Sequence, residues 1–169
     1  MDREEINKAL ESLVLLVDTR EHETEQAIRR LKSTGLPTER KKLSFGDYSA
    51  KVQTLSGEID FSDQFAIERK MNLDELAICY TSQRERFTTE FRRAKKADAK
   101  LYLLVENGSY EAILRATYRS KVSPQAFLAS VFTWLARYNC QVIMCEQEAS
   151  GRLIREIVYR EVKERLERG

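Results

Sequence analysis

The chain has 169 residues, 42% of them hydrophobic and 33% charged, with a formal net charge of +2. This length suits one domain with a substantial core, and the near-neutral charge does not by itself indicate a nucleic-acid-binding protein. No apolar run approaches the ~20 residues that a membrane span requires, which excludes a membrane-spanning protein. The charged first five residues lack the apolar segment of a signal peptide, so we expect a cytoplasmic protein, associated with the nucleoid or, in a eukaryote, nuclear.

Hydrophobic periodicity predicts an N-terminal helix, followed by a strand, a helix and three further strands. Residues 1–12 have Ile6 and Leu10 at helical spacing and form a helix or an extension. In the next helix Ala27, Ile28 and Leu31 share one side, and the glycine at position 35 suits its C-terminal end. The predicted helix covers 23–34, and the predicted strands cover 13–17, 36–43, 48–55 and 64–70.

The second half alternates helices with apolar strands. Asn72 and Pro124 suit the first turns of two helices, and Phe127 and Trp134 lie on an apolar side that we interpret as core packing. Strand–helix alternation at both ends, with a strand meander between them, predicts an α/β fold: a mixed central sheet flanked by helices. We find no repeat or linker, so we expect residues 1–169 to form a single domain. The predicted helices are 72–80, 83–97, 124–138 and 150–168, and the predicted strands are 101–105 and 141–145.

Histidine and cysteine are scarce, and this limits the chemistry open to the protein. His22 is the only histidine, which excludes histidine-rich zinc sites and argues against a Ser-His-Asp triad. Cys79, Cys140 and Cys145 show no paired metal-ligand spacing, and we interpret them as reduced thiols in the core. Catalysis would therefore rest on carboxylates and lysine, with or without a bound metal ion.

A run of three charged residues ends the apolar strand that begins at Phe65. Side chains on a strand alternate between faces, so Glu68 and Lys70 share one face while Arg69 shares the other with Phe65 and Ile67. A carboxylate beside an amine on a rigid strand suits metal-dependent phosphodiester hydrolysis, in which the carboxylate holds a divalent cation and the lysine orients water. The alternative is a solvated strand end that carries charge without a catalytic role.

Four carboxylates lie at predicted strand ends or bends: Asp18, Glu21, Asp47 and Glu68. The glycine-marked bend before Asp47 and the hairpin that follows it would bring Asp47 close to Glu68 in space. If the three strands concerned are neighbours in one sheet, the four carboxylates meet at one edge. Magnesium takes oxygen ligands and keeps several waters, so two or three carboxylates suffice to hold it. Ordinary solvated acidic residues are the alternative.

The predicted helix 83–97 is strongly basic and is suited to follow a DNA backbone, since lysine and arginine displace the counterions of phosphates. Arg84 is nearest to the candidate site in sequence, and we expect it to contact phosphate. A solvated helix face is the alternative.

Three motifs, in this order, resemble the nuclease domain of the XPF family of structure-specific DNA endonucleases. The motifs are Asp18-Thr19-Arg20-Glu21, Gly46-Asp47-Tyr48, and Glu68-Arg69-Lys70 followed by Asp74. Arg86 with Glu90 is a loose counterpart of a family helix that carries Arg-x-x-x-x-Gln, and Glu106 ends a matching apolar strand. The resemblance covers roughly residues 13–145.

The resemblance implies a restriction-endonuclease-like fold and a cofactor of Mg²⁺ or Mn²⁺. Its catalytic set would be Asp18, Glu21, Asp47, Glu68 and Lys70. Within this set Asp47, Glu68 and Asp18 would hold the metal, and Lys70 would position the attacking water. Outside this set, Arg20, Arg84 and Arg86 would contact DNA, and Arg69 and Asp74 would support the site structurally. Arg20 could instead turn toward the neighbouring carboxylates.

The implied function is a divalent-metal-dependent endonuclease that cuts branched or flapped DNA in repair or recombination, as a homodimer or heterodimer. Relatives usually carry a tandem helix-hairpin-helix domain, and we find neither this domain nor a helicase region in the sequence. We expect dimerisation because the two C-terminal helices have apolar sides that look larger than one sheet face needs. Two alternatives stay open: a non-catalytic DNA-binding or scaffolding subunit, and a less selective nicking or recombination nuclease of the same fold.

Overall fold

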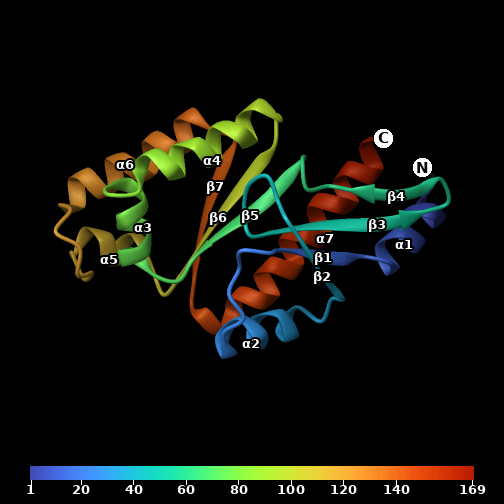
Figure 1. Ribbon diagram of the computed structural model, residues 1–169, viewed down its shortest axis with the longest axis horizontal. Coiled ribbons are helices and arrows are strands. Elements are labelled where there is room, and N and C mark those ends of the chain that lie inside the picture. Colours follow the sequence, from blue (N-terminus) through green and yellow to red (C-terminus); the bar gives the residue numbers. More distant parts are fainter.

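Seven strands form one mixed sheet in the computed structural model, which describes residues 1–169 (Figure 1). The strands are β1 (Val14–Asp18), β2 (Thr38–Lys41), β3 (Tyr48–Thr54), β4 (Gly57–Asp60), β5 (Phe65–Lys70), β6 (Lys100–Glu106) and β7 (Cys140–Cys145). Their spatial order is β2-β1-β3-β5-β6-β7, and β4 pairs with β3 beside this path. β1 is parallel to β2, β3 is antiparallel to both β1 and β5, and β5, β6 and β7 are parallel.

Helices cover both faces of the sheet. They are α1 (Arg3–Glu11), α2 (Glu25–Thr34), α3 (Leu73–Tyr80), α4 (Arg84–Lys96), α5 (Tyr110–Leu114), α6 (Pro124–Arg137) and α7 (Ser150–Arg168). α1, α2 and α7 pack on one face, and α3, α4, α5 and α6 pack on the other. The predicted fold, a mixed central sheet flanked by helices, is confirmed.

Side-chain alternation along the central strands produces a separate core on each face. In β5, Phe65 and Ile67 face the core formed with α1 and α7, whereas Ala66 faces the core formed with α3, α4 and α6. Both faces of these strands are apolar because both are covered by helices. The same alternation continues into the charged end of β5 and divides the site residues between the two faces.

Local sequence signals set several helix boundaries where they were predicted. The side chains of Thr24, Asn72 and Ser123 each accept a hydrogen bond from the backbone N–H three residues further on. Gly35 ends α2 in the left-handed conformation, with φ of 63°. The predicted helix 150–168 coincides with α7.

The short elements β4 and α5 and the position of one side chain differ from the sequence interpretation. The sequence interpretation missed β4 because it is a four-residue strand with little apolar character, and α5 because its five residues are too few to show periodicity. Ile28 was expected on the apolar side of α2, but it is 57% exposed because the buried side of that helix is formed by Ala27, Arg30 and Thr34.

The two C-terminal helices lie on opposite faces of the sheet. α6 contributes Phe127, Val131 and Trp134 to one core, and α7 contributes Ile154 and Val158 to the other. Part of each apolar side is therefore used within the chain, while Phe132 of α6 remains 54% exposed, so the dimer stays a prediction. None of the helices combines the length and the apolar character needed to cross a membrane.

Candidate active site

A tight bend places Asp47 beside β5. The Asp47 N–H donates to the Ile67 carbonyl oxygen at 2.8 Å, and Asp47 Oδ2 accepts a hydrogen bond from the Arg69 N–H at 2.8 Å. Gly46 makes the bend possible, because its φ is 74° and a Cβ there would lie 2.6 Å from a side chain of β5. Glu68 lies between the two residues that Asp47 contacts, so the predicted proximity of Asp47 to Glu68 is confirmed.

Glu68 and Lys70 share the face of β5 that packs toward α3 and α4. Both side chains are buried, and Lys70 Nζ donates a hydrogen bond to Glu68 Oε1. The same ammonium lies 5.4 Å from the centroid of the Phe87 ring. Burial opposes the charge, but the Glu68 carboxylate outweighs it and raises the pKa of Lys70. Lys70 is therefore a fixed positive charge at neutral pH.

Asp47 and Glu68 lack enough compensating charge within the protein. Burial, together with the neighbouring Glu68 and Glu21, raises the pKa of Asp47 well above its usual value of 3.8. Burial also raises the pKa of Glu68, although Lys70 acts in the opposite direction. Asp47 Oδ1 and Glu68 Oε2 receive no hydrogen bond from the protein, since the bonds that reach these carboxylates use the other oxygen of each. Carboxylates in this state favour a bound cation.

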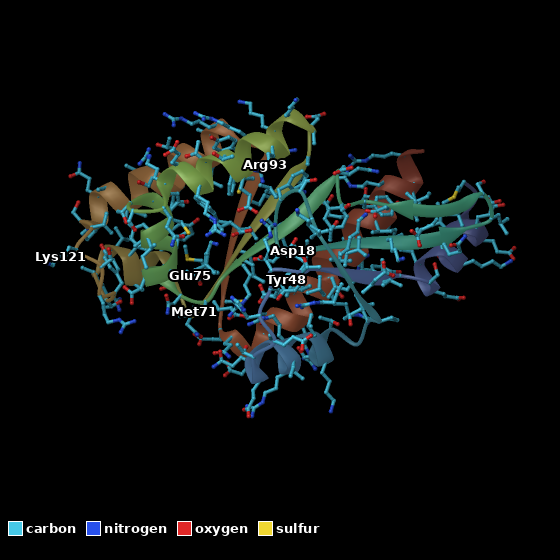
Figure 2. The ribbon with its side chains drawn as sticks, viewed as in Figure 1. Asp18, Tyr48, Met71, Glu75, Arg93 and Lys121 are labelled. Atoms are coloured by element: carbon cyan, nitrogen blue, oxygen red, sulfur yellow. The ribbon has the colours of Figure 1, made fainter.

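A cavity of about 390 Å³ opens over these groups, and its walls are mainly charged. The loop after β1, the bend before β3, the end of β5 and helices α3 and α4 supply most of its lining. Figure 2 shows two lining residues, Glu75 and Met71, on the α3 side of the sheet centre. The acidic lining residues are Glu21, Asp47, Glu68, Glu75 and Glu90, and the basic ones are Arg20, Arg69, Lys70 and Arg86.

On the other face of β5, Arg69 belongs to a buried network of charges. The acidic partner that Arg69 needs is Glu106 at the end of β6: Arg69 Nη2 donates to Glu106 Oε2 at 2.8 Å, and Arg30 Nε donates to Glu106 Oε1 at 2.9 Å. Arg30 Nη1 also donates to the Tyr48 hydroxyl at 3.1 Å. Both arginines lie 3.6 Å from Glu21 Oε1, so this network positions Glu21 at the cavity wall.

Asp18 ends β1 next to the site but does not line the cavity. Its Oδ1 accepts bonds from the N–H and Nε of Arg20 at 2.8 and 2.6 Å, and its Oδ2 accepts from the Leu43 N–H at 2.7 Å. Burial acts to raise its pKa, but these hydrogen bonds outweigh burial and lower the pKa of Asp18. Both oxygens of Asp18 accept hydrogen bonds from the protein, so Asp18 is less available to a cation than Asp47 or Glu68, and its role as a metal ligand stays a prediction. In this structure Asp18 anchors Arg20 and the segment that leads to Gly46.

The three arginines expected to contact DNA lie in different surroundings. Arg20 and Arg86 line the cavity. Arg84 lies with its guanidinium carbon 5.3 Å from the centroid of the Trp134 ring and does not line the cavity. Of these two arginines of α4, only Arg86 therefore reaches the cavity, because two residues along a helix turn a side chain to a different face.

Asp74 lies in the first turn of α3 and accepts hydrogen bonds from the connection between α5 and α6. Its Oδ1 accepts bonds from the N–H groups of Arg119 and Ser120 at 2.7 and 3.0 Å, and its Oδ2 accepts from Arg119 Nε at 3.0 Å. Asp74 is not part of the cavity lining, so its contribution to the site is through this connection.

Sequence reasoning missed Arg30 and Glu75. Arg30 is buried, and its position between Ala27 and Thr34 on the buried side of α2 was the available signal, since a buried arginine needs an acidic partner. Glu75 lines the cavity, and its Oε2 accepts a bond from the Met71 N–H at 2.7 Å. An acidic residue in the first turn of a helix is already explained by its favourable interaction with the helix dipole. The sequence therefore offered no reason to assign Glu75 to the site as well.

The donor set fits a hydrated divalent cation. No three histidine, cysteine, aspartate or glutamate side chains converge as a closed metal cage. Mg²⁺ keeps several of its waters, so the free oxygens of Asp47 and Glu68 are enough protein ligands. Mn²⁺ shares this preference for oxygen.

Comparison with known proteins identifies the family. The family model of the ERCC4 domain matches residues 17–157. This chain belongs to the ERCC4-domain family. The match confirms the predicted membership of the XPF group, and it covers all three motifs from which that membership was predicted. No curated protein sequence matches this chain.

Solved structures of an ERCC4-domain relative show the same fold. XPF from Aeropyrum pernix superimposes with a TM-score of 0.62 at 19% sequence identity, over 88% of this chain and 61% of that chain. XPF from Aeropyrum pernix in complex with DNA superimposes with a TM-score of 0.62 at 18% identity, over 89% of this chain and 66% of that chain. The ERCC4-domain chain described here thus corresponds to less than two thirds of the length of the relative.

Proposed function

We propose that this ERCC4-domain protein is an endonuclease that hydrolyses phosphodiester bonds of DNA near branched or flapped junctions, with Mg²⁺ or Mn²⁺ as its cofactor. The observation that supports this most directly is the juxtaposition of Asp47, Glu68 and Lys70 in one charged cavity. Family membership supports the same function, because XPF from Aeropyrum pernix has been solved in complex with DNA.

Asp47 and Glu68 would hold the cation through the two oxygens that receive no hydrogen bond from the protein. The bound cation would supply Lewis-acid stabilisation of the charge that develops on the phosphate. Glu21, on the same cavity wall, adds negative charge that favours cation binding. The backbone of Arg69 fixes Asp47, and its side chain is fixed by Glu106.

Lys70 would act on the water and the phosphate as a cation. Because Glu68 raises its pKa, Lys70 stays protonated and cannot take a proton from the attacking water. Its N–H groups can orient that water while the water oxygen bonds to phosphorus, one bridging P–O bond breaks, and a proton of the water passes through solvent to the oxygen that leaves. The same charge offsets the negative charge that builds on the phosphate oxygens.

A panel of labelled DNA substrates tests this proposal. We expect a 3′-flap, a fork and a four-way junction to be cut in Mg²⁺ or Mn²⁺ and to stay intact in EDTA, while plain duplex is cut much more slowly. Equal cutting of duplex would favour a less selective nicking or recombination nuclease. Binding of branched DNA without cutting, in either metal, would favour a non-catalytic subunit of a nuclease complex.

A homodimer or heterodimer, and a role in DNA repair or recombination, stay predictions that the family resemblance supports. Sedimentation velocity at micromolar concentration tests the first of these. A single monomeric species at every concentration would count against a homodimer.

A further inference from the structure

A second hollow, of about 630 Å³, adjoins the carboxylate cavity along α4. The two are continuous, since Arg20, Gln83, Arg86 and Glu90 line both of them. None of the eight residues that line the second hollow is hydrophobic. This surface therefore offers charge and hydrogen bonds but no apolar or aromatic contact.

One side of α4 builds most of this hollow. Arg86, Thr89 and Arg93 recur at spacings of three and four residues, which places them on one side of the helix, while Phe87 and Phe91 are buried in the core. Arg86 and Arg93 are seven residues apart, or about 10 Å along the helix axis. Figure 2 shows Arg93 on α4, above the centre of the sheet where Asp18 and Tyr48 lie.

The guanidinium groups of Arg86 and Arg93 are free. Neither forms a salt bridge or a side-chain hydrogen bond with another residue of the chain, although both line a concave surface. Arg20 is paired with Asp18, yet 49% of its side chain is exposed. Of the two acidic lining residues, Glu90 uses one oxygen to accept the Gly46 N–H at 2.9 Å, and the other, Glu85, is exposed. Free guanidinium groups in a polar hollow are suited to bind phosphate.

We propose that this hollow binds the phosphodiester backbone of the DNA strand beside the scissile phosphate, with Arg86 as the near contact and Arg93 as the far contact. The proposal rests on the function proposed above. The two arginines are about 10 Å apart along the helix axis, so they can contact two different phosphates of one strand. Because no aromatic or apolar residue lines the hollow, it contacts the backbone and not the faces of bases, and its contribution to affinity is independent of base sequence.

Salt-dependent binding of a fluorescently labelled branched DNA tests this assignment. The parent protein carries Glu68→Gln and is kept in EDTA, so that no substrate is cut during the titration. Arg93→Gln is compared with Arg92→Gln, which removes a neighbouring exposed arginine that does not line the hollow. We expect Arg93→Gln to raise the Kd several-fold, equally for two unrelated base sequences, and to lower the slope of log affinity against log salt by about 1.

Several results would overturn the assignment. They are equal effects of Arg93→Gln and Arg92→Gln, a loss of affinity that depends on base sequence, and no measurable binding by the parent. Arg93→Lys keeps the charge and should restore most of the salt slope; failure to do so, with an unchanged Tm, would also count against a phosphate contact. Both side chains are exposed, so thermal melting should show all three variants folded like the parent.

Cleavage by the chain with Glu68 intact separates this assignment from the proposed function. If that chain cuts branched DNA while Arg93→Gln and Arg92→Gln bind alike, the nuclease function stands and the hollow has another role. If that chain cuts nothing, and Arg93→Gln weakens binding while Arg92→Gln does not, the hollow binds DNA as proposed and the proposed nuclease function is wrong.

Discussion

Arg69 and Glu106 form a buried ion pair between β5 and β6, with Arg69 Nη2 2.8 Å from Glu106 Oε2, on the sheet face opposite Glu68 and Lys70. The backbone N–H of the same arginine donates to Asp47. Anchoring the Arg69 side chain on one face therefore steadies a carboxylate of the candidate metal site on the other.

Replacing Glu106 with alanine should destabilise the protein by about 3–5 kcal/mol, because it removes the buried carboxylate that accepts hydrogen bonds from Arg69 and Arg30 and leaves them only Glu21, 3.6 Å away. Urea unfolding measures this loss. The matched control is Glu164→Ala, which removes an exposed pair with Arg168 and should change stability by less than about 1 kcal/mol. Similar losses of stability in the two variants would show that the buried ion pairs of Glu106 stabilise the protein no more than an exposed pair does.

Substituting Gly151 should loosen the contact between α7 and α2. A Cβ at this position would lie 1.8 Å from Ser33 Oγ and 2.5 Å from the Arg30 carbonyl oxygen. Gly151→Ala therefore pushes α2 away and should cost about 1–3 kcal/mol, since overpacking is relieved only by backbone movement. Ser33→Gly should not rescue the variant, because the clash with the Arg30 backbone persists. Full rescue would show that the helix backbones are not in close contact.

Asp47→Asn should stabilise the metal-free protein at neutral pH. The pKa of Asp47 in the folded state is raised well above its usual value of 3.8. At a pH between 3.8 and this raised pKa, the folded state therefore binds a proton that the unfolded state has released. Stability therefore falls as the pH rises through this range, and the neutral amide removes that penalty. We expect a Tm higher by about 2–4 °C in EDTA at pH 7.5, measured by calorimetry. The exposed Asp63→Asn should leave Tm unchanged, and a lower Tm for Asp47→Asn would contradict the raised pKa.

Divalent metal binding should release protons. Burial raises the pKa of both Asp47 and Glu68, whereas a metal binds their deprotonated forms, so apparent affinity for Mn²⁺ should increase with pH up to the folded pKa values. Calorimetric titrations in two buffers of different ionisation enthalpy measure the released protons directly. Asp47→Asn should release fewer protons than the wild-type chain. Affinity that is independent of pH between 6 and 8 would mean that the carboxyls are already ionised without metal.

The sequence predicted the centre of the sheet and the core of the site because both depend on short-range patterns. Alternation at the end of β5 correctly divided Glu68 and Lys70 from Arg69, and the glycine bend correctly brought Asp47 to them. These relationships depend on strand geometry and on one left-handed glycine, both of which are local properties.

Relationships that depend on three-dimensional packing were not predictable in the same way. Asp18 is adjacent to the site in sequence, but hydrogen bonds from Arg20 and from Leu43, 25 residues away in sequence, use both of its oxygens. Arg84 appeared close enough to reach the cavity, but the rotation of α4 sets it against Trp134 and turns Arg86 inward. The face of the sheet on which a helix packs and the rotation of that helix about its axis depend on tertiary packing. The spacing of residues within the helix does not predict them.

Cleavage of a labelled 3′-flap DNA by the wild-type chain and by Glu68→Gln is the measurement that bears most directly on the central claim. Glu111→Gln, at an exposed acidic position on α5 outside the cavity, is the control. In Mg²⁺ we expect the wild-type and control chains to cut alike and Glu68→Gln to lose at least about 10²–10³-fold in rate while it still binds the DNA. If Glu68→Gln cut the DNA at the wild-type rate, this would contradict the assignment of the Glu68 carboxylate, and with it the proposed active site.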